Sequence, residues 1–203
     1  MLRLLGRKSS SNVRKILWAL EELQLRYERE DVGGEFGRNR DPEFLALNPN
    51  GLVPVLIDAD VVAWESNSIL RYLGAKYGEG ALWESDPGKR ARIDRWMDWQ
   101  LTVVSPSVSL LTMALVFKPP KLLPGEEISN ARERLAGAFR ILDRELSGKS
   151  FLGDERFSLA DISVGVVTYR WLALPIEREP LPNLQRWYAG LSARPAFVSS
   201  VPV

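Results

Sequence analysis

The sequence predicts two domains, an α/β domain at the N-terminal end followed by an all-helical domain. Short strand-like runs alternate with helical patterns up to residue 78, whereas from residue 87 onward only helical patterns occur. The stretch between them, GEGALWESD, is rich in glycine and polar residues and is typical of a linker. We therefore place the first domain at residues 1–78, the linker at 79–86 and the helical domain at 87–203.

The first domain opens with a strand, a helix and a second strand. Leu2–Leu5 is a short apolar run ended by Gly6, and residues 27–32 alternate apolar and charged side chains as a strand does. Apolar residues at helical spacing predict an amphipathic helix between these strands. The residues of this stripe are Val13, Ile16, Leu17, Leu20 and Leu23.

The second half of the domain contains a short helix, two strands and a longer helix. Pro42–Leu47 reads as the short helix, and the turn motif NPNG leads into an apolar strand headed by Pro54. A tight connection and a second short strand then precede a helix from Glu65 to Tyr77. The order β-α-β, short helix, β-β-α fits a thioredoxin-like sheet.

The helical domain begins with one long helix, Pro87–Phe117. Pro87 suits a first helical turn, Asp86 suits the cap before it, and Pro106 should kink the helix. Pro119-Pro120 should end it.

Three more helices are expected in this domain. Glu126–Leu146 is amphipathic, and FSLADI at residues 157–162 is a capping box that starts a buried helix. We interpret this box as a folding element. A last helix, Leu184–Ala193, should end near Arg194-Pro195.

Composition excludes several classes of chemistry. The 203 residues include no cysteine and no histidine, so disulfides, thiol nucleophiles, Ser-His-Asp catalysis and His-ligated metals are ruled out, and we expect no metal. The net charge of +1 gives no reason to expect nucleic acid or an anionic membrane as a partner. No run approaches 18 apolar residues and the N-terminus lacks a signal sequence, so a cytoplasmic protein is expected.

Residues 48–70 form a platform suited to a small peptide. A cis Val53–Pro54 bond would turn the Val53 N–H and C=O outward to pair with a peptide, although a trans proline at a strand edge is the alternative. The next helix N-terminus offers free N–H groups to a carboxylate. Ser66 adds a donor there, and Glu65 can accept from an ammonium group.

The motif G-x-V-P-V-L, followed by a hairpin and ESNSILRYL, resembles the glutathione-binding half of cytosolic glutathione S-transferases. The resemblance spans nearly the whole chain and is greatest to serine-type bacterial enzymes of theta, phi and zeta style. It implies glutathione as co-substrate, with Val53 beside the cis Pro54 holding the cysteinyl backbone. It also implies that Glu65 and Ser66 hold the γ-glutamyl group.

The same resemblance places the catalytic hydroxyl in the loop SSSN, between the first strand and the first helix. Aligning the helix ILWALEELQL with the zeta and phi classes puts Ser10 at the catalytic position, with Ser11 and Asn12 beside it. A shift of one residue would select Ser9 or Ser11. One of these serines could instead merely cap the helix. Asn12 could be a second donor to the sulfur.

One position departs from the family pattern. Many relatives have Lys or Arg where Leu52 stands, and use it to bind the glycyl carboxylate of glutathione. Leu52 lies in the binding segment but cannot make this contact, and Arg38 or Arg40 could replace it; a solvated loop is the alternative.

The resemblance further implies a small hydrophobic electrophile bound between the domains and a homodimer. Trp99, Met113 and Phe117 are candidates for the apolar wall, although such side chains at helical spacing also suit a core. Two alternatives stay open, a glutathione-dependent cis–trans isomerase like maleylacetoacetate isomerase and a non-catalytic binding or assembly module.

Overall fold

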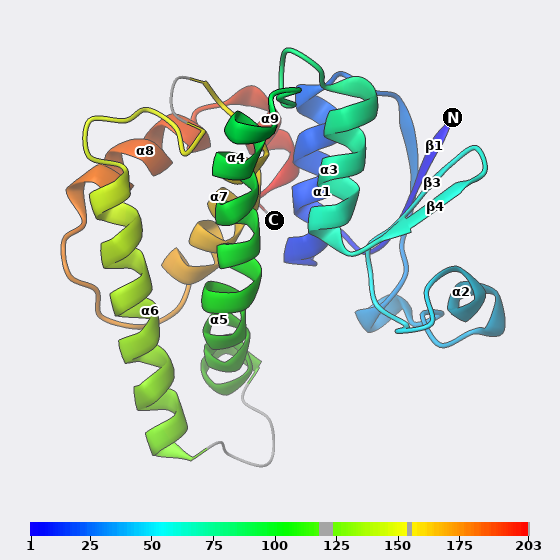
Figure 1. Ribbon diagram of the computed structural model, residues 1–203. Helices are drawn as coiled ribbons and strands as arrows, with labels where there is room; N and C mark the ends of the chain where they lie inside the picture. Colours follow the sequence, from blue (N-terminus) through cyan, green and yellow to red (C-terminus); the bar gives the residue numbers. More distant parts are fainter. Residues whose placement is uncertain (118–123, 154–155, 203) are drawn as a thin grey trace. The chain divides into compact units, whose positions relative to one another are not determined.

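In the computed structural model, which describes residues 1–117, 124–153 and 156–202, four strands form one mixed sheet (Figure 1). The sheet has the order β2-β1-β3-β4, with β1 parallel to β2 and β3 antiparallel to both β1 and β4. This sheet and the helical unit that follows it confirm the expected thioredoxin-like and all-helical architecture. The strands are β1 (Leu2–Leu5), β2 (Tyr27–Glu30), β3 (Val55–Asp58) and β4 (Val61–Trp64).

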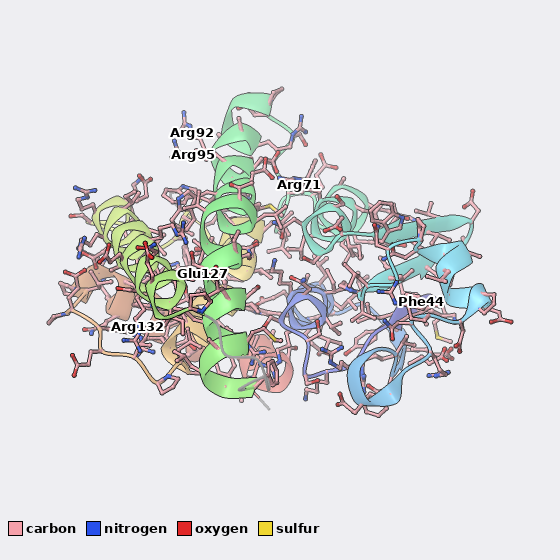
Figure 2. All side chains as sticks on the ribbon, turned by 90° about the horizontal axis from the view of Figure 1, so that it is seen from below. Phe44, Arg71, Arg92, Arg95, Glu127 and Arg132 are labelled. Atoms are coloured by element: carbon pink, nitrogen blue, oxygen red, sulfur yellow. The ribbon has the colours of Figure 1, made fainter. Side chains whose placement is uncertain are left out.

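Helices cover both faces of this sheet. Helices α1 (Ser11–Glu22) and α3 (Ser66–Tyr77) lie side by side on one face, and α2 (Pro42–Leu47) lies on the other (Figure 1). Phe44 of α2, labelled in Figure 2, is buried with Leu5, Val32 and Val55. Because side chains alternate along a strand, the neighbouring Leu4 and Leu56 point to the opposite face, where both are fully buried.

The far end of α3 is tied to the sheet by a buried carboxylate. Asp58 Oδ2 accepts hydrogen bonds from Tyr72 Oη at 2.7 Å, Lys76 Nζ at 2.7 Å and Tyr77 Oη at 2.6 Å. These three donors lie on the last turns of α3, so they fix the direction in which its N-terminus points.

The end of the chain packs with the first unit. The chain divides into one unit of Met1–Ser85 plus the stretch from Arg194, and a second unit, Asp86–Ala193. A helix that the sequence analysis did not expect, α9 (Pro195–Ser200), places Phe197 edge-on to Trp18 at 5.0 Å, and Arg194 pairs with Glu22 at 2.6 Å. The sequence analysis took Arg194-Pro195 as the end of the last helix, but Pro195 occupies the first turn of α9, where proline is tolerated.

The regular elements in the described part of the second unit are helices. The run from Pro87 to Phe117 is α4, α5 and two π-helical turns, Gln100–Val104 and Met113–Phe117. The first π turn ends at Val104, two residues before Pro106. The missing N–H of Pro106 removes one helical hydrogen bond, so this proline alters the helix without ending it. The expected stop at Pro119-Pro120 lies outside the described residues. The helices of this unit are α4 (Pro87–Trp99), α5 (Ser105–Thr112), α6 (Gly125–Glu145), α7 (Leu159–Leu172) and α8 (Pro182–Ser192).

By length and composition alone the Pro87–Phe117 run could cross a membrane, with a mean hydropathy of 1.6 over its most apolar window. Core helices of soluble proteins meet the same criterion, so this property is weak evidence for a membrane span.

Helix α7 is the buried centre of the second unit, and the expected capping box at its start is confirmed. Ser158 is the N-cap, and its backbone N–H donates to Asp161 Oδ2 at 2.9 Å. Asp161 also accepts from Ser158 Oγ, from Leu152 N at 2.9 Å and from Trp187 Nε1 at 2.8 Å. Burial raises the pKa of Asp161 to about 6, although these four donors act in the opposite direction.

We expect Asp161→Asn to destabilise the protein by at least about 2 kcal/mol, because an amide N–H₂ would face buried donors and leave them unpaired. The midpoint of urea unfolding, followed by circular dichroism, measures this loss. Asp60→Asn, at an exposed turn, is the matched control and should stay within about 0.5 kcal/mol of the parent. Equal midpoints for the two variants would contradict the structural role of Asp161.

Candidate functional site

The serine loop connects β1 to α1 and ends in the N-cap residue Ser10. The Ser10 carbonyl accepts from Arg14 N at 3.0 Å, but the Ser10 side chain makes no capping hydrogen bond to the helix. Ser9, Ser10 and Ser11 are all half-buried. The alternative that Ser10 serves only as a side-chain cap therefore loses its support, and its hydroxyl is left available at a helix N-terminus.

The start of α3 combines a strained backbone with a buried hydroxyl. Glu65 is the N-cap residue and has φ 66° and ψ 115°, a conformation that residues with a Cβ rarely adopt. The Glu65 side chain is exposed, whereas Ser66 directly after it is buried. The backbone N–H groups of the first turn of α3 are available to an anion here.

The structure brings the serine loop and the start of α3 together. Ser66 Oγ donates a hydrogen bond to Asn12 Oδ1 at 3.2 Å, across 54 positions of sequence. Asn12 is exposed and lies two residues after Ser10. The predicted thiol-binding loop and the predicted γ-glutamyl site are therefore in direct contact.

The sequence analysis missed Lys15 and Asn67, which lie directly behind this contact. Lys15 Nζ donates to Ser66 Oγ at 3.3 Å and to Asn67 Oδ1 at 3.2 Å, and both residues are buried. Burial lowers the pKa of Lys15 to about 7, while the nearby charge of Glu65 acts to raise it. No sequence signal could identify Lys15, because the pattern of α1 does not show which side faces α3.

The Val53–Pro54 peptide bond is cis, which confirms the first of the two geometries considered for it. Gly6, at the end of β1, lies against this junction. A Cβ on Gly6 would stand 2.6 Å from Val13 Cγ2 and 3.2 Å from Val53 Cβ, and the residue has φ 152°. The glycine therefore allows the serine loop and Val53 to approach closely.

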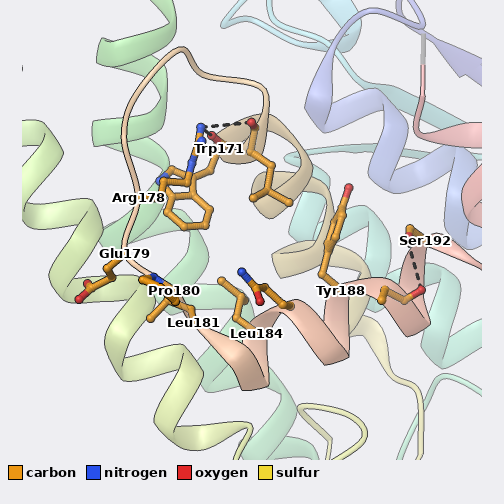
Figure 3. A pocket seen from close by; sticks show the side chains of 11 residues that line it. Trp171, Arg178, Glu179, Pro180, Leu181, Leu184, Tyr188 and Ser192 are labelled. Carbon is orange, nitrogen blue, oxygen red and sulfur yellow. Dashed lines mark hydrogen bonds between the residues drawn. The ribbon is translucent and has the colours of Figure 1, made fainter.

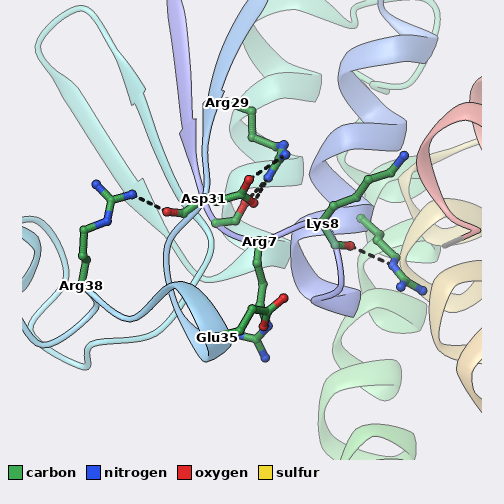
Figure 4. A network of polar contacts seen from close by, with 8 residues as sticks. Arg7, Lys8, Arg29, Asp31, Glu35 and Arg38 are labelled. Atoms are coloured by element: carbon green, nitrogen blue, oxygen red, sulfur yellow. Dashed lines mark hydrogen bonds and ion pairs between the residues drawn. The ribbon is translucent and has the colours of Figure 1, made fainter.

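The two candidate arginines lie in different surroundings. The Arg38 guanidinium donates to Glu30 Oε1 at 2.6 Å and to the Asp31 carbonyl, and Figure 4 shows the second of these contacts. Arg40 Nη1 lies 2.8 Å from where a Cβ on Gly51 would stand and donates to the Asn50 carbonyl at 3.4 Å. The Arg40 guanidinium therefore packs against the turn that leads to Val53, whereas the charge of Arg38 is paired with Glu30.

Leu52 is 58% exposed, and its carbonyl accepts from Asn48 Nδ2 at 2.8 Å. Its side chain has no group that can bind a carboxylate, as the sequence already showed.

The residues expected to contact an electrophile lie on the first long run of the helical unit. Met113 is 48% and Phe117 61% exposed, so neither is a core residue. Trp99 is half-buried and packs edge-on against the buried Trp96, with ring centroids 5.2 Å apart.

A separate pocket of about 430 Å³ lies between the end of α7 and α8 (Figure 3). Arg178 at its edge donates to the carbonyls of Trp171 and Leu172, the last residues of α7, and of Leu174 just beyond it. Its guanidinium lies 5.0 Å from the centre of the Trp171 ring. These contacts use Arg178 to close a helix terminus, so they define no ligand. Among the described residues there is also no cluster of three or more side chains suited to a metal.

Comparison with known proteins identifies the family. The N-terminal domain of glutathione S-transferases matches residues 9–76, and their C-terminal domain matches residues 125–190. The chain is 42% identical to glutathione S-transferase GstB of Escherichia coli K12, over the full length of both proteins. This chain is a glutathione S-transferase.

Two further relatives support the assignment. Glutathione S-transferase 3 of Zea mays is 31% identical, with 98% of this chain and 93% of the relative covered. The crystal structure of a theta class glutathione S-transferase from Xanthomonas axonopodis pv. citri, with glutathione bound, is 40% identical and superposes with a TM-score of 0.94. That match covers 100% of this chain and 97% of the solved one, so the family resemblance in the sequence is confirmed.

The backbone of this glutathione S-transferase is strained at Glu65, and substitution can measure that strain. We expect Glu65→Gly to be more stable than Glu65→Ala by about 1 kcal/mol, because glycine adopts the positive φ without steric cost. Both variants lack the carboxylate, so the difference in their urea midpoints reports the backbone alone. Equal stability would show that Glu65 carries no strain.

Proposed function

We propose that this chain binds glutathione across α1 and α3 and activates its thiol for attack on a hydrophobic electrophile. The observation that carries the proposal is the contact of Ser66 with Asn12, 3.2 Å long. It joins the predicted thiol end and γ-glutamyl end of one continuous site. The glutathione-bound relative from Xanthomonas supports the same ligand.

The γ-glutamyl group of glutathione is the part that the start of α3 suits best. Its α-carboxylate accepts hydrogen bonds from the free N–H groups of the first turn and from the Ser66 hydroxyl. Its ammonium group donates to the exposed Glu65 carboxylate. Val53, before the cis Pro54, pairs its backbone N–H and C=O with the cysteinyl residue. Leu52 lies beside Val53 in the same binding segment, but its side chain binds no charged group of glutathione.

Thiol activation is assigned to the serine loop. A free thiol has a pKa near ~8.5, so at neutral pH an enzyme must favour the thiolate. The Ser10 hydroxyl, which makes no capping bond, donates to the sulfur at the N-terminus of α1. Ser11 and Asn12 stand beside it, and the helix dipole favours the same negative charge.

Arg40, rather than Arg38, is the better candidate to bind the glycyl carboxylate. Its guanidinium lies against Gly51, in the turn that precedes Val53, and donates a hydrogen bond to the Asn50 carbonyl. Arg38, by contrast, already has a carboxylate partner in Glu30.

The electrophile, the oligomeric state and the location follow from the family. We assign Trp99, Met113 and Phe117 to the apolar wall of the electrophile site, since the last two offer exposed apolar surface. As in the family at large, the protein works as a cytoplasmic homodimer.

Ser10→Ala should raise the pKa of the glutathione thiol in the complex and lower kcat by about 100-fold, because the sulfur loses its donor. The pKa is measured from the thiolate absorbance during a pH titration, and kcat with an aryl halide electrophile. Ser9→Ala is the matched control and should change both quantities little. If the bound thiol kept the parent pKa in Ser10→Ala but had a raised pKa in Ser9→Ala or in Ser11→Ala, the serine whose loss raised the pKa would be the catalytic one.

Arg40→Gln should weaken glutathione binding about tenfold through the lost charge on the glycyl carboxylate, whereas Arg38→Gln should leave it within twofold. Isothermal titration calorimetry with glutathione measures both. A γ-glutamylcysteine ligand, which lacks the glycyl group, should bind the parent and Arg40→Gln equally. If Arg38→Gln weakened glutathione binding more than Arg40→Gln, Arg38 would be the residue that binds the glycyl carboxylate.

A further inference from the structure

The loop between β1 and α1 is tied to its surroundings where it leaves the sheet. The Gly6 N–H donates to the Glu30 carbonyl at 2.8 Å, and the Arg7 N–H donates to the Val32 carbonyl at 3.1 Å. The Gly6 carbonyl accepts from Arg29 Nη1 at 3.0 Å. These hydrogen bonds fix the first residues of the loop against β2 and the residues that follow it.

Arg14, one turn into α1, holds the other end of the same loop. Arg14 Nε donates to the Lys8 carbonyl at 3.0 Å (Figure 4), and the Arg14 N–H donates to the Ser10 carbonyl at 3.0 Å. The Ser10 N–H in turn donates to the Arg7 carbonyl at 3.2 Å. Arg14 therefore binds a carbonyl on each side of Ser9, one through its side chain and one through its backbone.

The two arginines that bind loop carbonyls lie in different surroundings. Arg14 is only 4% exposed, whereas Arg29 is exposed and also pairs with Asp31. Removal of an arginine from water is costly, and a packed side chain has little freedom to leave its contact. A hydrogen bond from a charged donor is also stronger than one between neutral groups. The Arg14 contact is therefore the more rigid of the two supports.

The position of this loop matters because of what it carries. In the proposed function the Ser10 hydroxyl donates to the glutathione sulfur at the N-terminus of α1. Such a hydrogen bond weakens steeply with distance and angle. The Lys8 carbonyl lies two residues before Ser10, so release of that carbonyl lets the backbone on which the hydroxyl stands move.

We propose that Arg14 is a positioning residue for thiol activation, which holds the Lys8 carbonyl and thereby keeps the Ser10 hydroxyl in place for the sulfur. This inference rests on the proposed function and adds a residue that acts through the loop without touching the substrate. It requires the Nε contact with Lys8 and is independent of any other contact that Arg14 makes.

The first variant removes the side-chain donor and keeps an apolar chain in the buried position. Arg14→Met should raise the pKa of the bound glutathione thiol by about 1 and lower kcat about tenfold, because a displaced hydroxyl favours the thiolate less. Binding of S-methylglutathione, whose sulfur cannot ionise, should stay within about threefold of the wild type because the donors at the start of α3 are unchanged. A thiolate absorbance titration gives the pKa, and calorimetry gives the affinity.

Two further variants separate the loop contact from charge and from stability. Arg14→Lys keeps a charged donor in place of the guanidinium and should recover part of the lost kcat and part of the thiol pKa. Arg26→Met, at an exposed arginine of the same unit, is the matched control and should behave like the wild type. A lower urea midpoint in Arg14→Met with the wild-type thiol pKa would show a purely stabilising role and overturn the inference.

A measurement on the wild-type protein tests the contact without Arg14→Met. In NMR spectra the Arg14 Nε–H should exchange with water more slowly than the Nε–H of the exposed Arg26, since it is buried and hydrogen-bonded. Its signal is assigned by its absence from the spectrum of Arg14→Lys. Equal exchange at the two arginines would overturn the inference even if Arg14→Met fails to fold.

The remaining outcomes separate this inference from the proposed function. If Ser10→Ala raises the bound thiol pKa and Arg14→Met leaves it unchanged, the role of Arg14 is wrong and the proposed function stands. If Arg14→Met loses S-methylglutathione binding with the thiol pKa unchanged, Arg14 supports binding and not activation, which also overturns the inference. No heat of binding with S-methylglutathione in the wild type would overturn the proposed function, and the inference with it.

Discussion

The packing of α1 against α3 is the constraint on which the site depends. The first turns of both helices must meet for Ser66 to reach Asn12 and for Lys15 to lie beneath both Ser66 and Asn67. Because each helix N-terminus has unpaired N–H groups, this meeting concentrates hydrogen-bond donors in one small region. The proposed site for a small peptide with a carboxylate and a thiolate depends on that concentration.

The surroundings hold this arrangement from several sides. At the far end of α3, Asp58 receives three hydrogen bonds and sets the helix direction. At the near end, Glu65 is kept in a strained conformation that turns its side chain outward while Ser66 turns in. Gly6 lets the serine loop approach Val53. The backbone strain at Glu65 and the close approach at Gly6 both occur at the proposed binding site. Proteins commonly depart from favourable local geometry at functional sites.

Buried polar groups serve different purposes in the two units. Asp161 is surrounded by four donors, so its carboxylate is fully used in holding the start of α7 and stabilises that unit. Lys15, in the other unit, donates to Ser66 Oγ and Asn67 Oδ1 at the start of α3, where the γ-glutamyl site is proposed. The difference lies in what each group faces, since both are buried.

The sequence by itself determined the order of the strands and of most helices, the capping box at Ser158 and the family, and it predicted the segments of the proposed site. These features are local: strand alternation, helical spacing and turn residues are written in neighbouring positions. The tertiary structure alone decided that α9 packs on α1 through Phe197, that Arg38 is paired with Glu30, and that Lys15 lies under Ser66. Those facts depend on which helix faces meet and on contacts across many positions, and no short pattern specifies them.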